Sequence, residues 1–123
     1  MPENLQQITA ERRGDVWCVG LKHRRLSITD LEQLGDELME LVTEDGCRRM
    51  ALSLGNDKLD CLYSAFIGKM IAVRKALAER NGHIHLAEVG PLALDVLRYT
   101  RLTQIFEIHR DLDAAVTALQ AAG

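Results

Sequence analysis

MALSLGNDKLDCLYSAFIGKMIAVRKALAERNGHIHL, residues 50–86, is the stretch that decides the fold. Its opening run, Met50–Leu54, is apolar except for Ser53 and predicts a buried strand. Apolar side chains with one arginine among them then recur at helical spacing, at Ile67, Met70, Ile71, Arg74 and Leu77. Asn81-Gly82 ends that helix, and residues 83–89, HIHLAEV, predict the next strand. The stretch is therefore expected to form one βαβ unit.

Ser64 lies in this unit between the first strand and the helix, at or next to the helix N-terminus. At that position backbone N–H groups are unpaired and the helix dipole favours negative charge. A phosphate group on the Ser64 hydroxyl would therefore be tolerated electrostatically. A plain helix cap is the alternative interpretation, because serine is a preferred N-cap residue whatever its function.

Composition and charge limit the class of protein. The chain has 123 residues, of which 47% are hydrophobic and 4% aromatic, and this predicts one globular domain. Its formal net charge of −3 argues against general nucleic-acid binding, which needs a concentrated basic face. The basic pairs Arg12/Arg13, Arg24/Arg25 and Arg48/Arg49 are interpreted as solvated flanks of strands and turns.

The cysteines and the N-terminal residues predict the compartment. Cys18, Cys47 and Cys61 are odd in number and far apart, which disfavours a disulfide framework or a zinc site and suits a reducing cytosol. The first residues, MPENLQQITAERRGD, lack the pattern of a signal peptide, and no apolar stretch approaches the length of a membrane span. We expect a cytoplasmic protein without membrane insertion.

Strand and helix signals alternate along the rest of the chain. Residues 15–21 predict a central strand buried on both faces, and residues 5–10 a short edge strand. Thr29 and Glu32 have the spacing of a capping box. An apolar stripe follows and stops at Gly46; its members are Leu31, Leu34, Leu38, Leu41 and Val42.

The C-terminal third predicts two more helices and a strand. Pro91 is suited to the first turn of a helix, and residues 105–108 predict a short closing strand. Asp111 is expected to cap a last amphipathic helix. The alternation predicts an α/β fold with a mostly parallel four- to five-stranded sheet flanked by about four helices. We expect an N-terminal edge segment at residues 1–14 and the domain itself at residues 15–121.

The sequence predicts neither a metal site nor a catalytic site. His83 and His85 share one face of a strand with Glu88 close behind, but two histidines do not close a coordination sphere. His23 and His109 make no stronger case. Glycine-rich phosphate loops and the G-x-S-x-G elbow are missing from the sequence. We therefore expect a protein that is not an enzyme, with no catalytic residue, metal or cofactor.

A family resemblance rests on several motifs in one order. The serine turn before Ile67-Gly68, the strand entry at Asn81-Gly82 and the string VLRYTRLTQIF at residues 96–106 are similar to the STAS domain family. The similarity runs from about Asp15 to Leu119 and is strongest with single-domain bacterial anti-sigma-factor antagonists. It implies a four-stranded sheet with helices, and a surface around the serine turn that binds a switch kinase, the anti-sigma factor.

The family's acceptor motif, of the type Asp-Ser-Ser-Gly-Leu-Gly, aligns with residues 63–68, YSAFIG. The resemblance thus implies that Ser64 is the phosphoacceptor. Tyr63 replaces the acidic residue of that motif, Ala65 replaces its second serine, and Phe66 replaces its first glycine. Arg101 occupies a position where the family frequently has a glycine. Tyr63 and Phe66 form either an exposed aromatic anchor for a partner or part of the core, and both interpretations stay open.

The predicted function is that of a non-enzymatic signalling module that binds an anti-sigma-factor-type serine kinase, displaces a sigma factor, and is released once phosphorylated. The alternative is a phosphorylation-independent STAS scaffold or regulatory subunit, for example of a transporter. The loss of the acidic residue at position 63, where this chain has Tyr63, favours this alternative. A small nucleotide- or lipid-binding domain is a third class without a supporting cluster. The predicted partner surface consists of Tyr63, Ser64, Ala65, Phe66 and Ile67 with Lys22, His23, Arg24, Arg25 and Leu26.

Overall fold

The computed structural model describes residues 4–121, and these form one mixed sheet with helices on both sides. None of the helices in these residues is long and apolar enough to cross a membrane. The elements are, in chain order, β1 (Ile8–Arg13), β2 (Val16–Leu21), α1 (Ile28–Thr43), β3 (Arg49–Ser53), α2 (Tyr63–Ala78), β4 (His83–Ala87), α3 (Pro91–Tyr99), the 3₁₀ turn η1 (Leu102–Gln104), β5 (Glu107–His109) and α4 (Leu112–Ala121).

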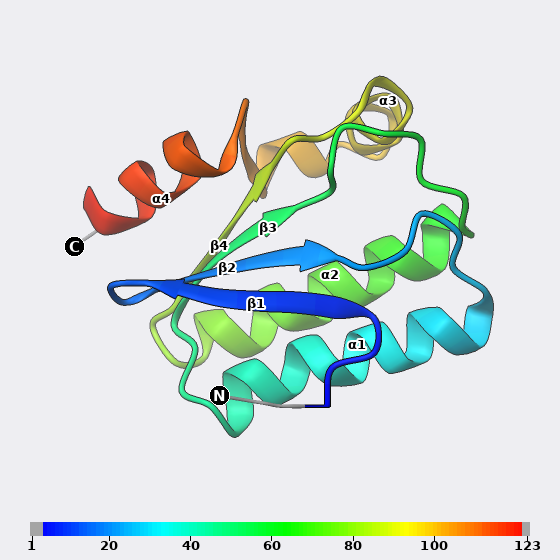
Figure 1. Ribbon diagram of the computed structural model, residues 1–123. Coiled ribbons are helices and arrows are strands. Elements are labelled where there is room, and N and C mark those ends of the chain that lie inside the picture. Colours follow the sequence, from blue (N-terminus) through cyan, green and yellow to red (C-terminus); the bar gives the residue numbers. More distant parts are fainter. Residues whose placement is uncertain (1–3, 122–123) are drawn as a thin grey trace.

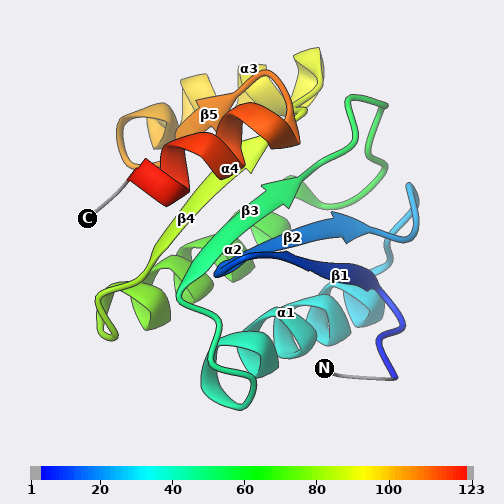
Figure 2. The ribbon, with the colours of Figure 1, turned by 60° about the vertical axis from the view of Figure 1, so that its left-hand side comes forward.

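The five strands lie in the sheet in the order in which they occur in the chain (Figure 1, Figure 2). β1 pairs with β2 in antiparallel fashion, and β2, β3, β4 and β5 run parallel to one another. Gly14, with φ +64°, makes the tight turn of the β1–β2 hairpin. The predicted fold class, a mostly parallel sheet with four helices, is confirmed. Residues 8–13 form a full edge strand of the sheet.

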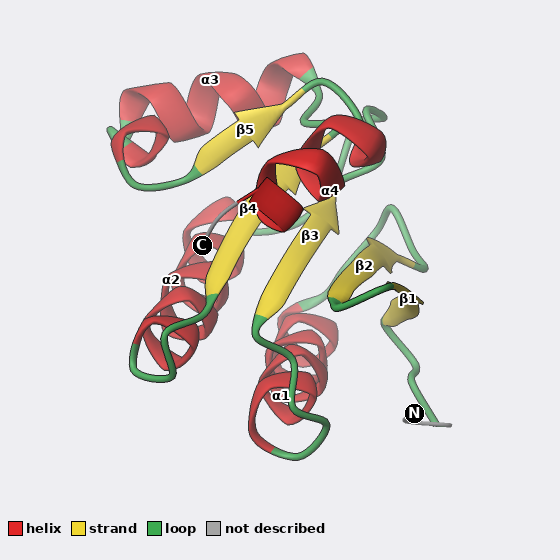
Figure 3. Cartoon of the chain, turned by 90° about the vertical axis from the view of Figure 1, so that its left-hand side faces the viewer, coloured by secondary structure: helices red, strands yellow, loops and turns green. Residues whose placement is uncertain are grey.

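Helices α1 and α2 lie along one face of the sheet, and α4 lies on the other (Figure 3). The first face holds a large core of aliphatic side chains together with Phe66 and Phe106. The second holds a small core in which alanines from β3 and β4 meet α4. Its members are Val16, Cys18, Ala51, Ala87, Ala115, Val116 and Leu119. β2 and β3 are interior strands, which explains why their apolar residues point to both faces.

The capping box of α1 differs from the prediction. It is formed by Ser27 and Asp30, not by Thr29 and Glu32. The Asp30 amide donates to Ser27 Oγ (3.1 Å), and the Ser27 amide donates to Asp30 Oδ2 (2.9 Å). Ser27 has an extended backbone (φ −71°, ψ 173°), the conformation that an N-cap requires, so the helix begins two residues earlier than the pattern at Thr29 indicates.

Three strand boundaries also differ from the predictions. β1 occupies residues 8–13 and not 5–10, because the amides of Gln6, Gln7 and Ile8 donate to the buried carboxylate of Glu37 on α1. β4 ends at Ala87, since the next residue, Glu88, takes a left-handed conformation with φ +54°. β5 is residues 107–109 and not 105–108, because the amides of residues 105 and 106 close the 3₁₀ turn on the Leu102 carbonyl.

Helix α2 buries a stripe that shares Ile67, Met70 and Leu77 with the predicted one and differs at the other positions. The buried members are Phe66, Ile67, Met70, Val73 and Leu77. Ile71 and Arg74, which the spacing places in the same stripe, are exposed, and 41% of Ile71 is accessible. The outward face of α2 thus carries an apolar side chain that the sheet does not cover.

Candidate partner-binding surface

The loops that follow β2 and β3 are joined at the carboxyl end of the parallel sheet. The Leu26 amide donates to the Asp60 carbonyl (2.9 Å), and the Asp60 amide donates to the Arg24 carbonyl (2.7 Å). These two bonds form a short parallel bridge between the Lys22–Leu26 turn and the residues just before α2. The loop after β4 joins the same group, because the Asn56 amide donates to the Glu88 carbonyl (2.6 Å). The two segments of the predicted partner surface are therefore neighbours.

Ser64 is the second residue of α2 and is exposed. The N-cap of the helix is Leu62, whose side chain cannot accept a hydrogen bond, and Ser64 makes no capping hydrogen bond. The interpretation of Ser64 as a plain helix cap is therefore wrong. The first turn of α2 contains no acidic residue either. The positive end of the helix dipole is consequently left without a compensating side chain at the place where the Ser64 hydroxyl emerges.

The start of α1, on the same side of the molecule, is the opposite case. Ser27 caps it, and Asp30 supplies a negative charge in its first turn. The hydrogen bonds from the amide and the hydroxyl of Ser27 hold the pKa of the Asp30 carboxyl below its ordinary value. Thr29 is the second residue of α1, as Ser64 is of α2. Only one of these two hydroxyls thus lies at a helix start whose first turn has no acidic side chain.

Five of the predicted surface residues have side chains that are buried or half-buried. Phe66 is 1% exposed and belongs to the core, so the interpretation of Phe66 as an exposed anchor is wrong. Leu26 and Ile67 are buried as well, at 4% and 9% exposed. Tyr63 is half-buried, and its hydroxyl donates to the Leu59 carbonyl (2.8 Å). Burial raises the pKa of this phenol. Arg24 is also half-buried, and its guanidinium donates to the Leu54 carbonyl (2.5 Å). These side chains support the surface from beneath.

The side chains that remain accessible are mostly polar. Lys22, His23, Arg25 and Ser64 are exposed, and Ala65 is partly so. Arg25 lies 3.4 Å from Asp60, with both side chains largely in solvent. Such a pair contributes little to stability, since exposed ion pairs are worth roughly 0–1 kcal/mol. The guanidinium of Arg25 is therefore available to a partner at small cost.

Three apolar side chains on this surface were missed in the sequence. Ile28, Leu62 and Leu92 are 52%, 55% and 47% exposed. Each lies at the start of a helix, α1, α2 and α3 respectively. Ile28 and Leu92 fit the apolar patterns of their helices, so periodicity alone assigns them to the core. Their position before the first full turn, where a helix extends past the sheet, is the signal that could have identified them.

A cleft of about 240 Å³ extends this surface between the β3–α2 loop and the start of α3. It is lined by Asn56, Asp57, Lys58, Leu59, Tyr63, Gly90, Pro91, Leu92 and Ala93. A side chain at position 90 could not be accommodated, because a Cβ there would lie 2.7 Å from the Asn56 carbonyl oxygen. The glycine thus allows the two loops to approach each other.

The histidines are arranged differently from the pattern considered in the sequence. The carboxylate of Glu88 accepts a hydrogen bond from the hydroxyl of Ser53, the last residue of β3 (2.5 Å), and is not grouped with His83 or His85. His109, which has no suggestive neighbours in the sequence, lies against His85. The set His83, His85 and Glu88 is therefore not formed in the structure.

Known proteins resemble this chain in sequence and in fold. No family profile matches it. It is 33% identical over 91 residues to BtrV of Bordetella bronchiseptica, described as an anti-sigma factor antagonist, covering 74% of this chain and 76% of BtrV. An anti-sigma factor antagonist from Thermotoga maritima has the same fold, with a TM-score of 0.78, 19% identity, and 92% and 94% of the two chains covered. The phosphorylated form of SpoIIAA from Bacillus also has this fold, with a TM-score of 0.65 and 14% sequence identity. The match covers 90% of this chain and 98% of SpoIIAA.

Proposed function

This chain belongs to the STAS family of anti-sigma factor antagonists, and on that basis we propose that it binds a serine kinase of the anti-sigma-factor type, with Ser64 as the phosphoacceptor. The family consists of signalling proteins that are not enzymes and act through a protein partner. In the proposed cycle the unmodified protein occupies the kinase and displaces a sigma factor. Phosphorylation of Ser64 then releases it.

One observation carries the proposal: Ser64 is exposed at a helix start that has neither a capping side chain nor an acidic residue. A phosphoserine brings about −1.5 to −2 charges, which the positive end of α2 would stabilise. If that charge lies inside the interface with the partner, a change of about 1–3 kcal/mol in binding free energy is enough to change the affinity for the partner roughly 5- to 150-fold.

The surroundings of Ser64 supply the contact area. Leu62 lies two residues before it, and Ile28 and Leu92 start the adjacent helices. Apolar side chains at the centre of an interface provide most of its affinity, while charged groups at the rim mainly affect the rate of association. Lys22 and Arg25 are suited to that rim, and they favour a partner whose contact surface is acidic.

Phosphorylation tests the proposal directly. The full chain is incubated with ATP and with serine kinases of the anti-sigma-factor type from the native host, and the products are mapped by mass spectrometry. We expect one phosphate, on Ser64, which Ser64→Ala abolishes while kinase binding is kept. Ser64→Asp should weaken binding, though less than phosphate, because one carboxylate has less charge and fewer acceptor oxygens.

Thr29→Ala is the matched control, because Thr29 has the same helix position on α1 and is also exposed. It should leave both phosphorylation and binding unchanged. Thermal melts of each variant exclude a loss of binding that arises from unfolding. If no kinase modifies Ser64 and Ser64→Asp binds its partner as tightly as the wild type, the phosphorylation-independent scaffold replaces the switch. Rescue of phosphorylation by Tyr63→Asp would show that Tyr63 had blocked recognition.

A further inference from the structure

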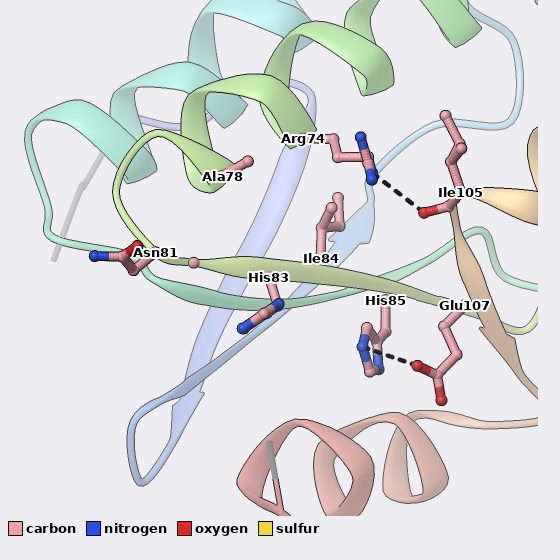
Figure 4. Close-up of a pocket in the computed structure, with 9 residues that line it drawn as sticks. Arg74, Ala78, Asn81, His83, Ile84, His85, Ile105 and Glu107 are labelled. Carbon is pink, nitrogen blue, oxygen red and sulfur yellow. Dashed lines mark hydrogen bonds and ion pairs between the residues drawn. The ribbon is translucent and has the colours of Figure 1, made fainter. Parts of the chain in front are cut away.

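Three titratable side chains meet on the α4 face of the sheet, far from Ser64. His85 is on β4, and Glu107 and His109 are on β5. The parallel register places Glu107 beside His85 and His109 beside Ala87, so all three side chains project from the same face. Figure 4 shows His85 and Glu107 pointing toward each other on the side where α4 lies. Both histidine side chains are largely buried, with 11% and 15% exposed, whereas the Glu107 carboxylate is 61% exposed.

The distances in this cluster are those of ligands around one ion. His109 Nε2 lies 3.1 Å from His85 Nδ1 and 3.4 Å from Glu107 Oε1. One ligand atom from each residue can be chosen so that all lie within 4.8 Å of one another. Around a tetrahedral zinc ion with bonds of about 2.0–2.1 Å, neighbouring ligand atoms are separated by about 3.3 Å.

The second nitrogen of His85 fits the same arrangement. His85 Nε2 lies 3.3 Å from Glu107 Oε2, the other oxygen of the carboxylate. Each nitrogen of the His85 imidazole thus lies close to an atom of another member of the cluster: Nδ1 is 3.1 Å from His109 Nε2, and Nε2 is 3.3 Å from Glu107 Oε2. Either nitrogen is therefore placed among the other candidate ligand atoms.

We infer that His85, Glu107 and His109 form a binding site for one divalent transition-metal ion of the zinc class. Two imidazoles and one carboxylate are a common ligand set for Zn²⁺, and such sets keep a position for water or for a further ligand. A cavity of about 630 Å³ lined by His83, His85 and Glu107, among others, opens beside the cluster. The remaining coordination position would face this opening.

The placement of the ligands indicates what the ion would do. β5 is only three residues long and is the edge strand of the sheet. It pairs with β4 through residues 107–109 alone. An ion held by one side chain of β4 and two of β5 would fasten this short strand to the sheet. Because a metal that binds only the folded state stabilises it, the effect should be measurable as a rise in melting temperature.

Cobalt and zinc test the site in the full chain after removal of any affinity tag. We expect one equivalent of Co²⁺ to produce the visible absorption of a low-coordinate complex, Zn²⁺ to displace it, and Zn²⁺ to raise the melting temperature. His109→Ala removes a ligand, so it should weaken binding by more than the roughly 10- to 100-fold that loss of a supporting group costs. Glu107→Gln removes the carboxylate at an exposed position, so the fold is retained and the loss of metal binding is read without ambiguity.

His83→Ala is the matched control, because His83 is exposed and lines the same cavity but is not a member of the cluster. It should bind Co²⁺ as the wild type does. Circular dichroism checks that each variant is folded. The inference is overturned if the wild type binds no Co²⁺ at millimolar concentration, or if Glu107→Gln and His109→Ala bind it as tightly as the wild type.

Discussion

The α1–α2 face of the sheet buries long aliphatic and aromatic side chains, whereas the α4 face buries mostly short ones. Among the described residues, the first core contains 25 buried side chains and the second contains seven. Two helices of 16 residues cover the first face, and one helix of 10 residues covers the second. Most apolar burial, and so most hydrophobic stabilisation, therefore lies on one side, which leaves the other side able to hold polar groups.

Two glutamates show the same difference at the level of single side chains. Glu37 is 6% exposed on the α1 side, where it accepts hydrogen bonds from the amides of Gln6, Gln7 and Ile8. Glu107, on the α4 side, is largely exposed and contacts two imidazoles. A buried carboxylate is stable only when donors replace the water it loses. The carboxylate in the deep core is thus structural, while the one on the shallow face is accessible to a ligand.

Truncation of one leucine in each core should give the largest effect and tests the comparison most directly. Leu38 on α1 and Leu119 on α4 are both 0% exposed. We expect Leu38→Ala to lower the free energy of unfolding by about 4–5 kcal/mol, near the upper end for this substitution, because the surrounding core is closed on all sides. Leu119→Ala should cost about 2–3 kcal/mol, since a single terminal helix can move to fill part of the cavity.

Urea denaturation of the two variants measures these costs. Leu62→Ala, which truncates a leucine that is 55% exposed, is the control and should stay within about 0.5 kcal/mol of the wild type. Equal costs for Leu38→Ala and Leu119→Ala would show that the two cores are equally closed, and the contrast between the faces would then be lost.

Much of the fold follows from apolar periodicity. β2 and β3 are interior strands with nearly continuous apolar runs, and β4 is an interior strand that alternates histidines with apolar residues at its start. The positions of all three are predictable to within about two residues. The start of α1 was misplaced because two overlapping capping patterns, Ser27 with Asp30 and Thr29 with Glu32, are separated by two residues. Which of them caps the helix depends on the backbone conformation of Ser27, and the residue types do not reveal it.

The sites were less predictable than the fold. The approach of the Lys22–Leu26 turn to the start of α2 could be expected, because the carboxyl ends of parallel strands share one edge of the sheet. The exposure of Leu62 could not, since it depends on where α2 begins. His85 and His109 are 24 residues apart, and only the β4–β5 register brings them together. No local pattern encodes that register in a strand as short as β5.

Neutralisation of the two glutamates should give the next largest effect. Glu37→Gln places an amide NH₂ group among backbone N–H donors, so at least one hydrogen bond is lost in a buried position. We expect it to lower the free energy of unfolding by about 1–3 kcal/mol in urea. Glu107→Gln without metal should change it by less than about 0.5 kcal/mol, as is usual for an exposed residue. A larger cost for Glu107→Gln than for Glu37→Gln would reverse the assignment of the two carboxylates.

Two helical glycines should give the smallest effects, and these differ in sign. A Cβ at Gly68, on the outward side of α2, would meet no atom within 4 Å. Gly68→Ala should therefore stabilise the protein by about 0.5–1 kcal/mol through helix propensity alone.

A Cβ at Gly35, on α1, would lie 2.6 Å from Cδ of Lys69 on α2, so this lysine must move from its position beside Glu32. The gain in helix propensity at Gly35 is offset by the displacement of Lys69, so Gly35→Ala should leave the free energy of unfolding unchanged or lower it, as measured by urea denaturation.

Nothing within the chain requires a glycine at position 68, so the role of Gly68 is expected to be in contact with a partner. Helix α2 exposes Gly68 one turn after Ser64. A partner that approaches the backbone there would be hindered by a methyl group. Gly68→Ala should thus be more stable and yet bind the proposed kinase partner more weakly. Unchanged binding together with the gain in stability would restrict the contact to the first turn of α2 and to the loops.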